Sequence, residues 1–422
     1  MASIILSFVG NQDPYSDNTA QEGSIVTLVN HLLADQNTIS RVILLHTKTT
    51  GQRAIDTKAW LESAPVNLPE SAITILPVDE ALSQDPVNLL LAVQEARRGL
   101  EQALPYLSPD DSLEFNASSG TPVMKSSWSV LQAAGYAPHS HVWQIRNPRE
   151  INLGQLRVFK TDVATLKNEF DLRIIKRQVQ DYNYSGALLT LKESNLLTDV
   201  AAALLKYGHY RISLDFNRAF SSLEPGNCAS TSQWVKEASP LRQKDAKALL
   251  QEAYFNTLIR LKNQQYAYFL VGLSCLQENI LRFLVNDQLG LKISNKRSQI
   301  PQFWQAIKQV DQGNLDQHLQ NYTLPRGGKL RLNESISRYV LIGILDYYPQ
   351  FSVIMPLIKE LNEYCDLRNE SVHGFVGVSE IEEEARLLTT LRQLMKQVTK
   401  ISDSNPFDRL NQHICDLLDR SI

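Results

Sequence analysis

The sequence predicts two architectures in one chain, an α/β domain over the first third and an all-helical region after it. Five short apolar runs, each ended by turn-forming residues, predict strands over 3–9, 41–47, 72–78, 112–116 and 141–146. Runs that are apolar on both faces are typical of a parallel-rich sheet covered by helices on both sides. Amphipathic stretches separate these runs, and this alternation favours a Rossmann-like, doubly wound sheet.

Helical spacing of apolar residues predicts three helices between these strands, over 25–33, 89–104 and 123–134. Thr121 is a suitable N-cap for the third helix, Pro122 suits its first turn, and Gly135 is a natural stop. Each predicted helix follows a predicted strand, as the α/β interpretation requires.

The strand pattern fades after about residue 155, and the remainder predicts helices over 185–206, 243–262, 265–285, 381–398 and 407–419. Pro225, Gly226 and Pro240 lie in a looser stretch, which predicts a boundary or an exposed connection. We therefore predict an α/β domain over 1–155, a helical connecting region over 156–240 and a second helical domain over 241–422.

Composition limits the class of protein. The chain has 422 residues, 43% of them hydrophobic and 21% charged, which is typical of a globular protein with two or three domains. Its four cysteines form no CxxC pair, so a disulfide scaffold is excluded and a reduced, cytoplasmic protein is expected. The first apolar run has no basic leader and no later segment offers about 18 uncharged apolar residues, so we expect no membrane contact.

Two predicted strand ends are rich in small polar residues. The loops Gly10–Asp13 and Asn116–Pro122 follow the first and fourth strands, where ligands of doubly wound sheets bind. Free amides at the next helix start, with Lys125 nearby, would suit a phosphate, although a plain turn with a helix cap explains the same residues. The sequence has no GxGxxG after the first strand and no GxxxxGK[ST], which argues against a dinucleotide cofactor and a P-loop NTPase.

A basic stretch runs from Lys292 to Arg331. Its cations outnumber its carboxylates, and three aromatic residues lie among them, which is compatible with binding of single-stranded nucleic acid. An ordinary solvated surface with aromatic residues in the core explains the pattern equally well. The cations are Lys292, Lys296, Arg297, Lys308, Arg326, Lys329 and Arg331, and the aromatic residues are Phe303, Trp304 and Tyr322.

The segment 356–375 carries the most informative pattern. Pro356 suits the first turn of a helix, and Leu357, Ile358, Leu361 and Cys365 form one apolar stripe. Arg368 continues that stripe, where a guanidinium requires a partner or a cleft. His373 follows near the helix stop at Gly374.

Five residues along a straight helix rotate by about 140°. Arg368 and His373 therefore face different directions unless the helix deforms near Glu370–Val372, or unless a second copy of the chain brings its own pair. Either case points to a site that is completed at an interface.

The string Arg368-Asn369-x-x-x-His373 resembles the R-[polar]-x-x-x-H motif of HEPN ribonucleases. The first third resembles a CARF domain, through the Gly10–Tyr15 loop and through Asn116-x-Ser118-Ser119-Gly120-Thr121-Pro122-x-Met124-Lys125. The order CARF then HEPN, at this length, is similar to the accessory ribonucleases of type III CRISPR systems in antiviral defence.

This resemblance implies an endoribonuclease that cuts single-stranded RNA without a metal or other cofactor. The ribose 2′-hydroxyl would attack the adjacent phosphorus and leave 2′,3′-cyclic phosphate ends. The family role of His373 is proton transfer or phosphate positioning, that of Arg368 is stabilisation of transition-state charge, and that of Asn369 is to orient these groups.

The resemblance also implies an allosteric activator, a cyclic oligoadenylate bound on the two-fold axis of a homodimer. The matching contacts are Gly10, Asn11 and Gln12 in the first loop and Ser118, Ser119, Gly120, Thr121 and Lys125 in the second, with Lys48 and Thr49 as further candidates. We expect a ring of four adenylates. The family leaves ring nuclease activity of the CARF domain open.

Three alternatives remain. A non-catalytic cyclic-nucleotide-sensing regulator would make Arg368 and His373 structural. A HEPN toxin would bind another nucleotide or a protein through its first domain. A metabolic enzyme of the Rossmann class ranks last, because the cofactor fingerprint is missing.

Overall fold

The computed structural model describes residues 2–16, 21–137, 139–147, 151–161, 163–224, 229–293, 297–325, 327–374 and 377–420. At 164–165, 229–230, 297 and 368–374 only the backbone is described. The chain divides into two compact units, one up to Arg173 and one from Ile174, and each is treated by itself. The domain limits at 155 and 240 stay predictions.

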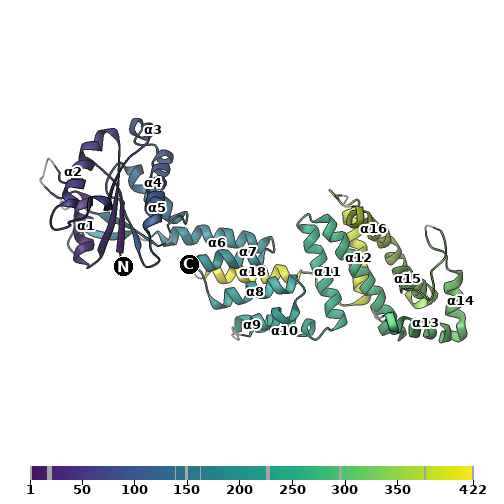
Figure 1. The fold of residues 1–422 in the computed structure, drawn as a ribbon. Helices are drawn as coiled ribbons and strands as arrows, with labels where there is room; N and C mark the ends of the chain where they lie inside the picture. The colour runs from purple at the N-terminus through teal and green to yellow at the C-terminus, as the bar shows by residue number, and fades with distance from the viewer. Residues whose placement is uncertain are drawn as a thin grey trace. The chain divides into compact units, whose positions relative to one another are not determined.

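The first unit, whose strands are drawn as arrows in Figure 1, contains a six-stranded sheet with the order β3-β2-β1-β4-β5-β6. The five strands from β1 to β5 pair in parallel, and β6 pairs antiparallel with β5. The Rossmann-like, parallel-rich sheet and its five predicted strands are confirmed. The strands are β1 (Ala2–Phe8), β2 (Thr38–His46), β3 (Ile73–Pro77), β4 (Ser112–Asn116), β5 (Ser140–Ile145) and β6 (Val158–Thr161). Sequence reasoning missed β6, because four half-exposed residues give no apolar run.

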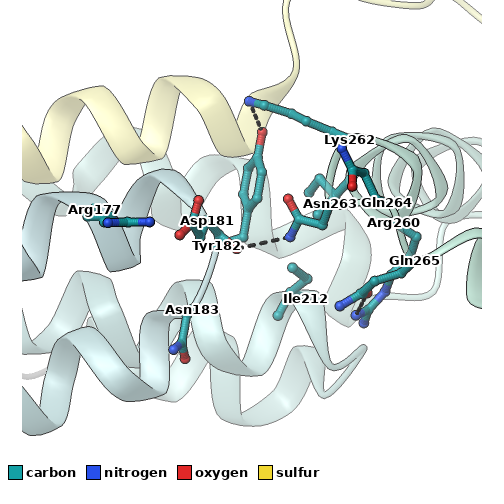
Figure 2. Close-up of a pocket in the computed structure, with 11 residues that line it drawn as sticks. Arg177, Asp181, Tyr182, Asn183, Ile212, Arg260, Lys262, Asn263, Gln264 and Gln265 are labelled. Atoms are coloured by element: carbon teal, nitrogen blue, oxygen red, sulfur yellow. Dashed lines mark hydrogen bonds between the residues drawn. The ribbon is translucent and has the colours of Figure 1, made fainter.

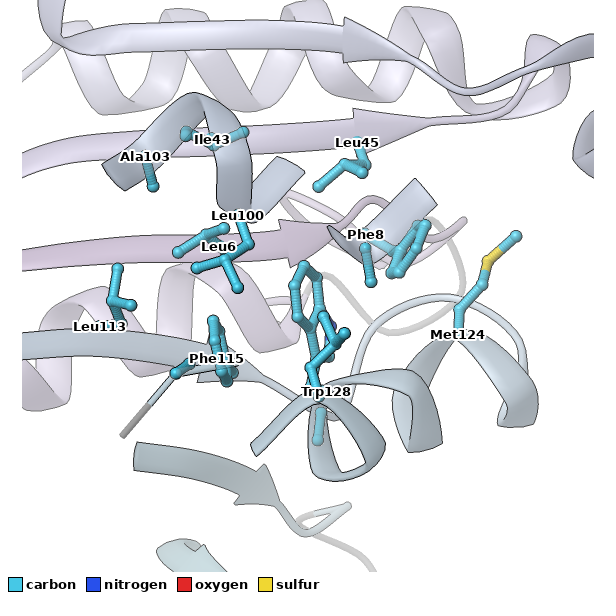
Figure 3. Close-up of a cluster of buried hydrophobic side chains, with 14 of the residues drawn as sticks. Leu6, Phe8, Ile43, Leu45, Leu100, Ala103, Leu113, Phe115, Met124 and Trp128 are labelled. Carbon is cyan, nitrogen blue, oxygen red and sulfur yellow. The ribbon is translucent and has the colours of Figure 1, made fainter. Parts of the chain in front are cut away.

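Helices cover both faces of this sheet. On one face, α4 and α5 bury Leu6, Phe8 and Phe115, with Trp128 stacked on Phe115 at a ring distance of 4.9 Å (Figure 3). On the other face, α1 and α2 cover a second apolar cluster around Ile5 and Leu44. The helices are α1 (Ser24–Ala34), α2 (Gly51–Glu62), α3 (Glu80–Gln84), α4 (Leu89–Ala103) and α5 (Pro122–Ala133), with short 3-10 turns at Lys48–Thr50, Glu70–Ala72 and Leu104–Tyr106.

The rest of the chain is helical, as predicted. Its helices are α6 (Ala164–Gln180), α7 (Tyr184–Glu193), α8 (Asp199–Ile212), α9 (Phe216–Leu223), α10 (Ala229–Arg242), α11 (Ala246–Lys262), α12 (Tyr266–Phe283), α13 (Ile300–Gln309), α14 (Asn314–Asn321), α15 (Arg338–Tyr347), α16 (Met355–Gly374), α17 (Glu384–Val398) and α18 (Pro406–Asp419). A π-helical turn, Leu284–Gln288, extends α12, and 3-10 turns lie at Arg297–Gln299, Val310–Gly313 and Pro349–Phe351. The single helix predicted over 185–206 was wrong. It is divided between α7 and α8, because Thr198 caps a new helix start through Ala201 N.

The same helix–turn–helix geometry occurs at four places within the described residues. Each turn has a non-glycine residue with positive φ, preceded by a helix end and followed by the N-cap residue of the next helix. Amide hydrogen bonds back to the preceding helix repeat in all four turns. The positive-φ residues are Tyr182, Leu214, Lys244 and Gln264. Because their side chains differ so much, the sequence did not reveal this repeat.

The helical unit corrects one sequence prediction, on Pro240, and favours one of the two interpretations left open for the basic stretch, that of aromatic residues in the core. Pro240 lies inside α10 and not in a loose connection, while Pro225 and Gly226 fall outside the described residues. Phe303 and Trp304 of the basic stretch are buried on α13, so they belong to the core and cannot stack on nucleic acid bases.

The stretch Tyr266–Gln288 is long and apolar enough to cross a membrane by length and composition. In the most apolar 18-residue window of this stretch, 56% is buried inside the structure, so other parts of the protein cover more than half of it. The cysteines within the described residues, Cys275, Cys365 and Cys415, are free, and Cys228 lies outside them.

Candidate functional site

The first candidate site lies at the carboxyl ends of β1 and β4. After β1 the chain builds β2 and β3 on one side, then crosses to β4 on the other side of β1. The two strand ends therefore form a topological switch point, where open α/β sheets bind ligands. The loops predicted from sequence, Gly10–Asp13 and Asn116–Pro122, both leave the sheet at this point, and the structure places Asn116 at the end of β4 and Pro122 at the start of α5.

Asp13 joins these two loops. Its Oδ2 accepts hydrogen bonds from the Ser119 hydroxyl and from Gly10 N, the latter at 3.1 Å. Its Oδ1 accepts from Ile25 N, in the first turn of α1, at 3.2 Å. Burial raises the pKa of the Asp13 carboxyl, although its hydrogen-bond donors oppose the shift. Sequence reasoning assigned no role to Asp13, although a carboxylate in a small polar loop was a usable signal.

The second loop is held by side chains beneath it. Asn116 is fully buried and donates through Nδ2 to Ser7 Oγ and Ser24 Oγ, each at 3.1 Å. Its Oδ1 accepts from Ser118 N at 3.0 Å, and Ser118 Oγ accepts from Ile145 N at 2.7 Å. These bonds fix the loop to three neighbouring elements of the unit.

The predicted helix start after this loop is confirmed. Thr121 is the N-cap of α5, and its hydroxyl accepts from Met124 N and donates to Pro86 O at 2.7 Å. Gly120 has φ +89°, and an added Cβ would lie 3.0 to 3.1 Å from atoms of Met124 and Phe8. The backbone there approaches its neighbours so closely that glycine is needed. Lys125 lies in the first turns of α5 and is half-buried.

The predicted ligand residues therefore fall into two groups. Asn11 and Gln12 are exposed at the strand ends, whereas the Ser119 side chain is buried and bonded to Asp13. Lys48 and Thr49, after β2, are also exposed, and Lys48 forms an ion pair with Glu80. Ligand contact by each of these residues stays a prediction.

The second candidate site lies on α16. The predicted apolar stripe is confirmed by the burial of Ile358, Leu361 and Cys365. The backbone of Arg368, Asn369 and His373 lies in the last turns of α16, while the side chains of these three residues lie outside the described ones. The helix continues to Gly374 without a break at Glu370–Val372.

Two polar contacts fix α16 just before these residues. Gln277 of α12 donates through Nε2 to Ile358 O at 2.8 Å and to Asn362 Oδ1 at 3.0 Å. From α15, Arg338 and Tyr339 both donate to the Asp366 carboxylate, Tyr339 at 3.1 Å. Asp366 lies two residues before Arg368, so α15 holds α16 directly beside the candidate motif.

Within the described residues, His, Cys, Asp and Glu form no group of three that could hold a metal ion. Metal independence stays a prediction of the resemblance.

Comparison with known proteins assigns a family to the helical part. Residues 238–415 match the family described as the Cas_Csm6 HEPN domain. The fold is similar to that of Enterococcus italicus Csm6 bound to cyclic hexa-2′-fluoro-hexa-dAMP, with a TM-score of 0.68 and 16% sequence identity. That similarity covers 99% of this chain and 100% of the Enterococcus chain, and at this identity it shows a common fold. No curated protein matches the sequence.

A Rossmann-like unit followed by a region that matches a HEPN domain is the arrangement expected of a CARF–HEPN protein. The match of residues 238–415 and the fold of the whole chain together support a protein of the Csm6 type.

Proposed function

We propose that this protein is a cyclic-oligoadenylate-activated endoribonuclease that cuts single-stranded RNA in type III CRISPR antiviral defence. One observation carries the proposal: Arg368-Asn369-x-x-x-His373 lies at the end of a helix inside the region that matches the Csm6 HEPN domain. HEPN domains generally act as ribonucleases.

The proposed chemistry needs only groups that the chain supplies. The 2′-hydroxyl of a ribose attacks the adjacent phosphorus, the 5′-oxygen leaves, and a 2′,3′-cyclic phosphate remains. The His373 imidazole transfers the protons, since an imidazole group in general can both donate and accept a proton near neutral pH. The Arg368 guanidinium stabilises the added charge on phosphate oxygens, and Asn369 orients these groups.

The proposed active form is a homodimer. Because α16 is helical through Gly374, Arg368 and His373 lie about 140° apart around its axis. The unbroken helix argues against a deformation that would bring Arg368 and His373 together within one chain. It therefore favours a pair that forms with a second copy of the chain. A two-fold interface would bring the same residues from both subunits together.

The proposed activator binds at the loops after β1 and β4. Enterococcus italicus Csm6 was bound to an analogue with six nucleotides, whereas we expected four adenylates. Because 16% identity supports only the fold, we propose cyclic oligoadenylate as the ligand class and leave ring size to titration.

Ring nuclease activity receives less support than activator binding. The Ser119 hydroxyl is bonded to Asp13, and the Thr121 hydroxyl to Pro86 O and Met124 N. Both hydroxyls are already used to hold the loops, so we propose a binding role for this region.

A fluorescent RNA assay tests the proposal. Purified protein is supplied with rings of three to six adenylates in EDTA, and we expect cleavage of RNA but not DNA, with cyclic phosphate ends. His373→Ala and Arg368→Ala should each abolish cleavage and retain ring binding. Ring binding by the wild type without RNA cleavage would establish the non-catalytic regulator, and cleavage without any response to rings would establish the toxin alternative.

A further inference from the structure

A polar cleft of 860 Å³ lies on the helical unit (Figure 2). It is enclosed by the α6–α7 turn, the end of α8 and the α11–α12 turn. Three cationic side chains, Arg177, Arg260 and Lys262, line it, against one carboxylate, Asp181, and Lys262 also forms an ion pair with Asp408 at 3.4 Å. This local excess of positive charge contrasts with a chain whose net charge is −3.

Hydrogen bonds between the α6–α7 turn and the α11–α12 turn, and one within the second of these turns, fix the shape of the cleft. Asn263 Nδ2 donates to Asp181 O at 3.0 Å, and Lys262 Nζ donates to the Tyr182 hydroxyl at 2.7 Å. Arg260 Nη1 donates to Gln265 Oε1 at 2.9 Å. Figure 2 shows Arg177 and Arg260 at opposite ends of the cleft. Charges spread along a groove suit a chain of phosphates better than a single small anion.

The cleft lies at the motif end of α16. Gln277 of α12 contacts Ile358 and Asn362 of α16. Ser274 lies nearer the start of α12, and it forms a side-chain hydrogen bond with Cys365, which lies nearer the end of α16. The two helices are therefore antiparallel. Gln265 lies nine residues before Ser274, and Gly374 lies nine residues after Cys365. At about 1.5 Å per residue, the α11–α12 turn is level with the end of the Arg368–His373 segment.

We propose that this cleft binds the phosphate backbone of the single-stranded RNA substrate beside the cleavage site. The proposal rests on the proposed function for its substrate class. Arg177 and Arg260 bind successive phosphates, since a guanidinium offers paired donors to phosphate oxygens. Asp181 opposes this binding, and Lys262 maintains the turn through Tyr182.

The test measures RNA binding apart from cleavage. In a His373→Ala background with EDTA, fluorescence anisotropy of a labelled 20-nucleotide oligouridine gives Kd between 50 and 300 mM salt. We expect Arg177→Glu and Arg260→Glu each to raise Kd about five- to tenfold and to lower the slope of log Kd against log salt by about 0.7 for each phosphate contact that is lost. Asp181→Asn should lower Kd about twofold.

Lys192→Glu is the matched control, because Lys192 is an exposed cation of α7 outside the cleft. It should leave Kd within twofold of the parent, and thermal melting verifies that each variant is folded. Equal Kd values for Lys192→Glu and for both arginine variants would overturn the cleft proposal.

Cleavage kinetics separate the cleft from the proposed function. With His373 intact and activator present, the arginine variants should raise KM for the 20-nucleotide RNA with kcat unchanged, and leave cleavage of a four-nucleotide RNA unchanged. Unaltered KM for the long RNA would reject the cleft and leave the proposed function standing. Absence of RNA cleavage by the wild type would reject the proposed function, while the anisotropy data would still decide whether the cleft binds RNA.

Discussion

The Ser119 hydroxyl donates a hydrogen bond to Asp13 Oδ2, and this bond joins the loops that follow β1 and β4. Ser119 lies in the hydroxyl-rich loop, whereas Asp13 lies 106 residues earlier and also accepts from Gly10 N and Ile25 N. Any ligand at the switch point therefore meets two loops and the first turn of α1 that share one buried carboxylate. A change at this carboxylate affects all three segments together.

Ser119→Ala should lower the free energy of unfolding by about 1–3 kcal/mol, because the buried Asp13 carboxylate loses one of its donors. Urea denaturation of the full chain measures this. Ser126→Ala is the control, since its exposed hydroxyl donates only to Pro122 O one turn away. Equal stabilities of the two variants would show that the Ser119–Asp13 bond does not hold the loops.

Gly120→Ala should destabilise the protein more than Gly135→Ala. Both glycines have positive φ, +89° and +80°, so alanine costs about 1–2 kcal/mol at either position. Only at Gly120 would the new methyl group also press on Met124 and Phe8, whereas at Gly135 nothing lies within 4 Å. The difference between the two melting temperatures isolates the packing effect, and identical values would contradict it.

Glu114 should make stability depend on pH in acid. Burial opposes ionisation of this carboxylate, but hydrogen bonds from His141, Ser112 and Trp143 lower its pKa below the ordinary value of 4.5. A lowered folded-state pKa stabilises the fold above pH 4.5, and this stabilisation is lost as the pH falls through the folded-state pKa.

The free energy of unfolding should therefore differ most between wild type and Glu114→Gln near about pH 5.5, and the difference should shrink toward about pH 3.5. Glu101→Gln, which alters an exposed pair with Arg97, serves as the control. A difference that does not vary with pH would show that Glu114 has an ordinary pKa.

Arg211 should be the most sensitive charged residue of the helical unit. Its guanidinium is buried, with both contacts to the Glu252 carboxylate at 2.7 Å and further bonds to the Tyr207 hydroxyl and Glu237. Arg211→Met leaves Glu252 buried without its partner and should cost about 3–5 kcal/mol. Arg211→Met combined with Glu252→Leu should recover most of that loss in urea denaturation. A double variant no more stable than the single one would mean that the two residues act independently.

Two inactive variants should complement each other if the active site forms between subunits. Arg368→Ala and His373→Ala chains, mixed after unfolding and refolded together, would place one intact Arg368 opposite one intact His373 in each mixed dimer. If mixing is random, RNA cleavage should return to about a quarter of the wild-type rate. Each variant refolded alone is the control, and no recovery on mixing would contradict pairing across the interface.

Periodicity predicted the sheet well because its strands are buried on both faces. The runs around Ile5 and Leu44 could form little else, and both lie in the core of the first unit. The break between α7 and α8 escaped prediction because the apolar spacing continues across it, and only the cap at Thr198 ends the pattern. Pro240 was misassigned because it lies inside α10, two residues before that helix ends at Arg242.

Candidate site residues were predictable only where they lie close together in sequence. The loop around Ser119 and the string from Arg368 to His373 are local patterns. Asp13 and Ser119 meet because β1 and β4 are neighbours in the sheet, and the cleft depends on Arg177 and Arg260, whose helices are far apart in the chain.

The α/β and helical halves, the cap at Thr121 and the Arg368–His373 spacing could all be predicted from sequence, since each depends on residues within a few turns of one another. Two relationships are visible only in the folded chain: Asp13 is hydrogen-bonded to both loops at the switch point, and α12 runs antiparallel to α16, so that a basic cleft lies level with the motif. Contacts between distant segments depend on how whole elements pack, and local propensity carries no information about that packing.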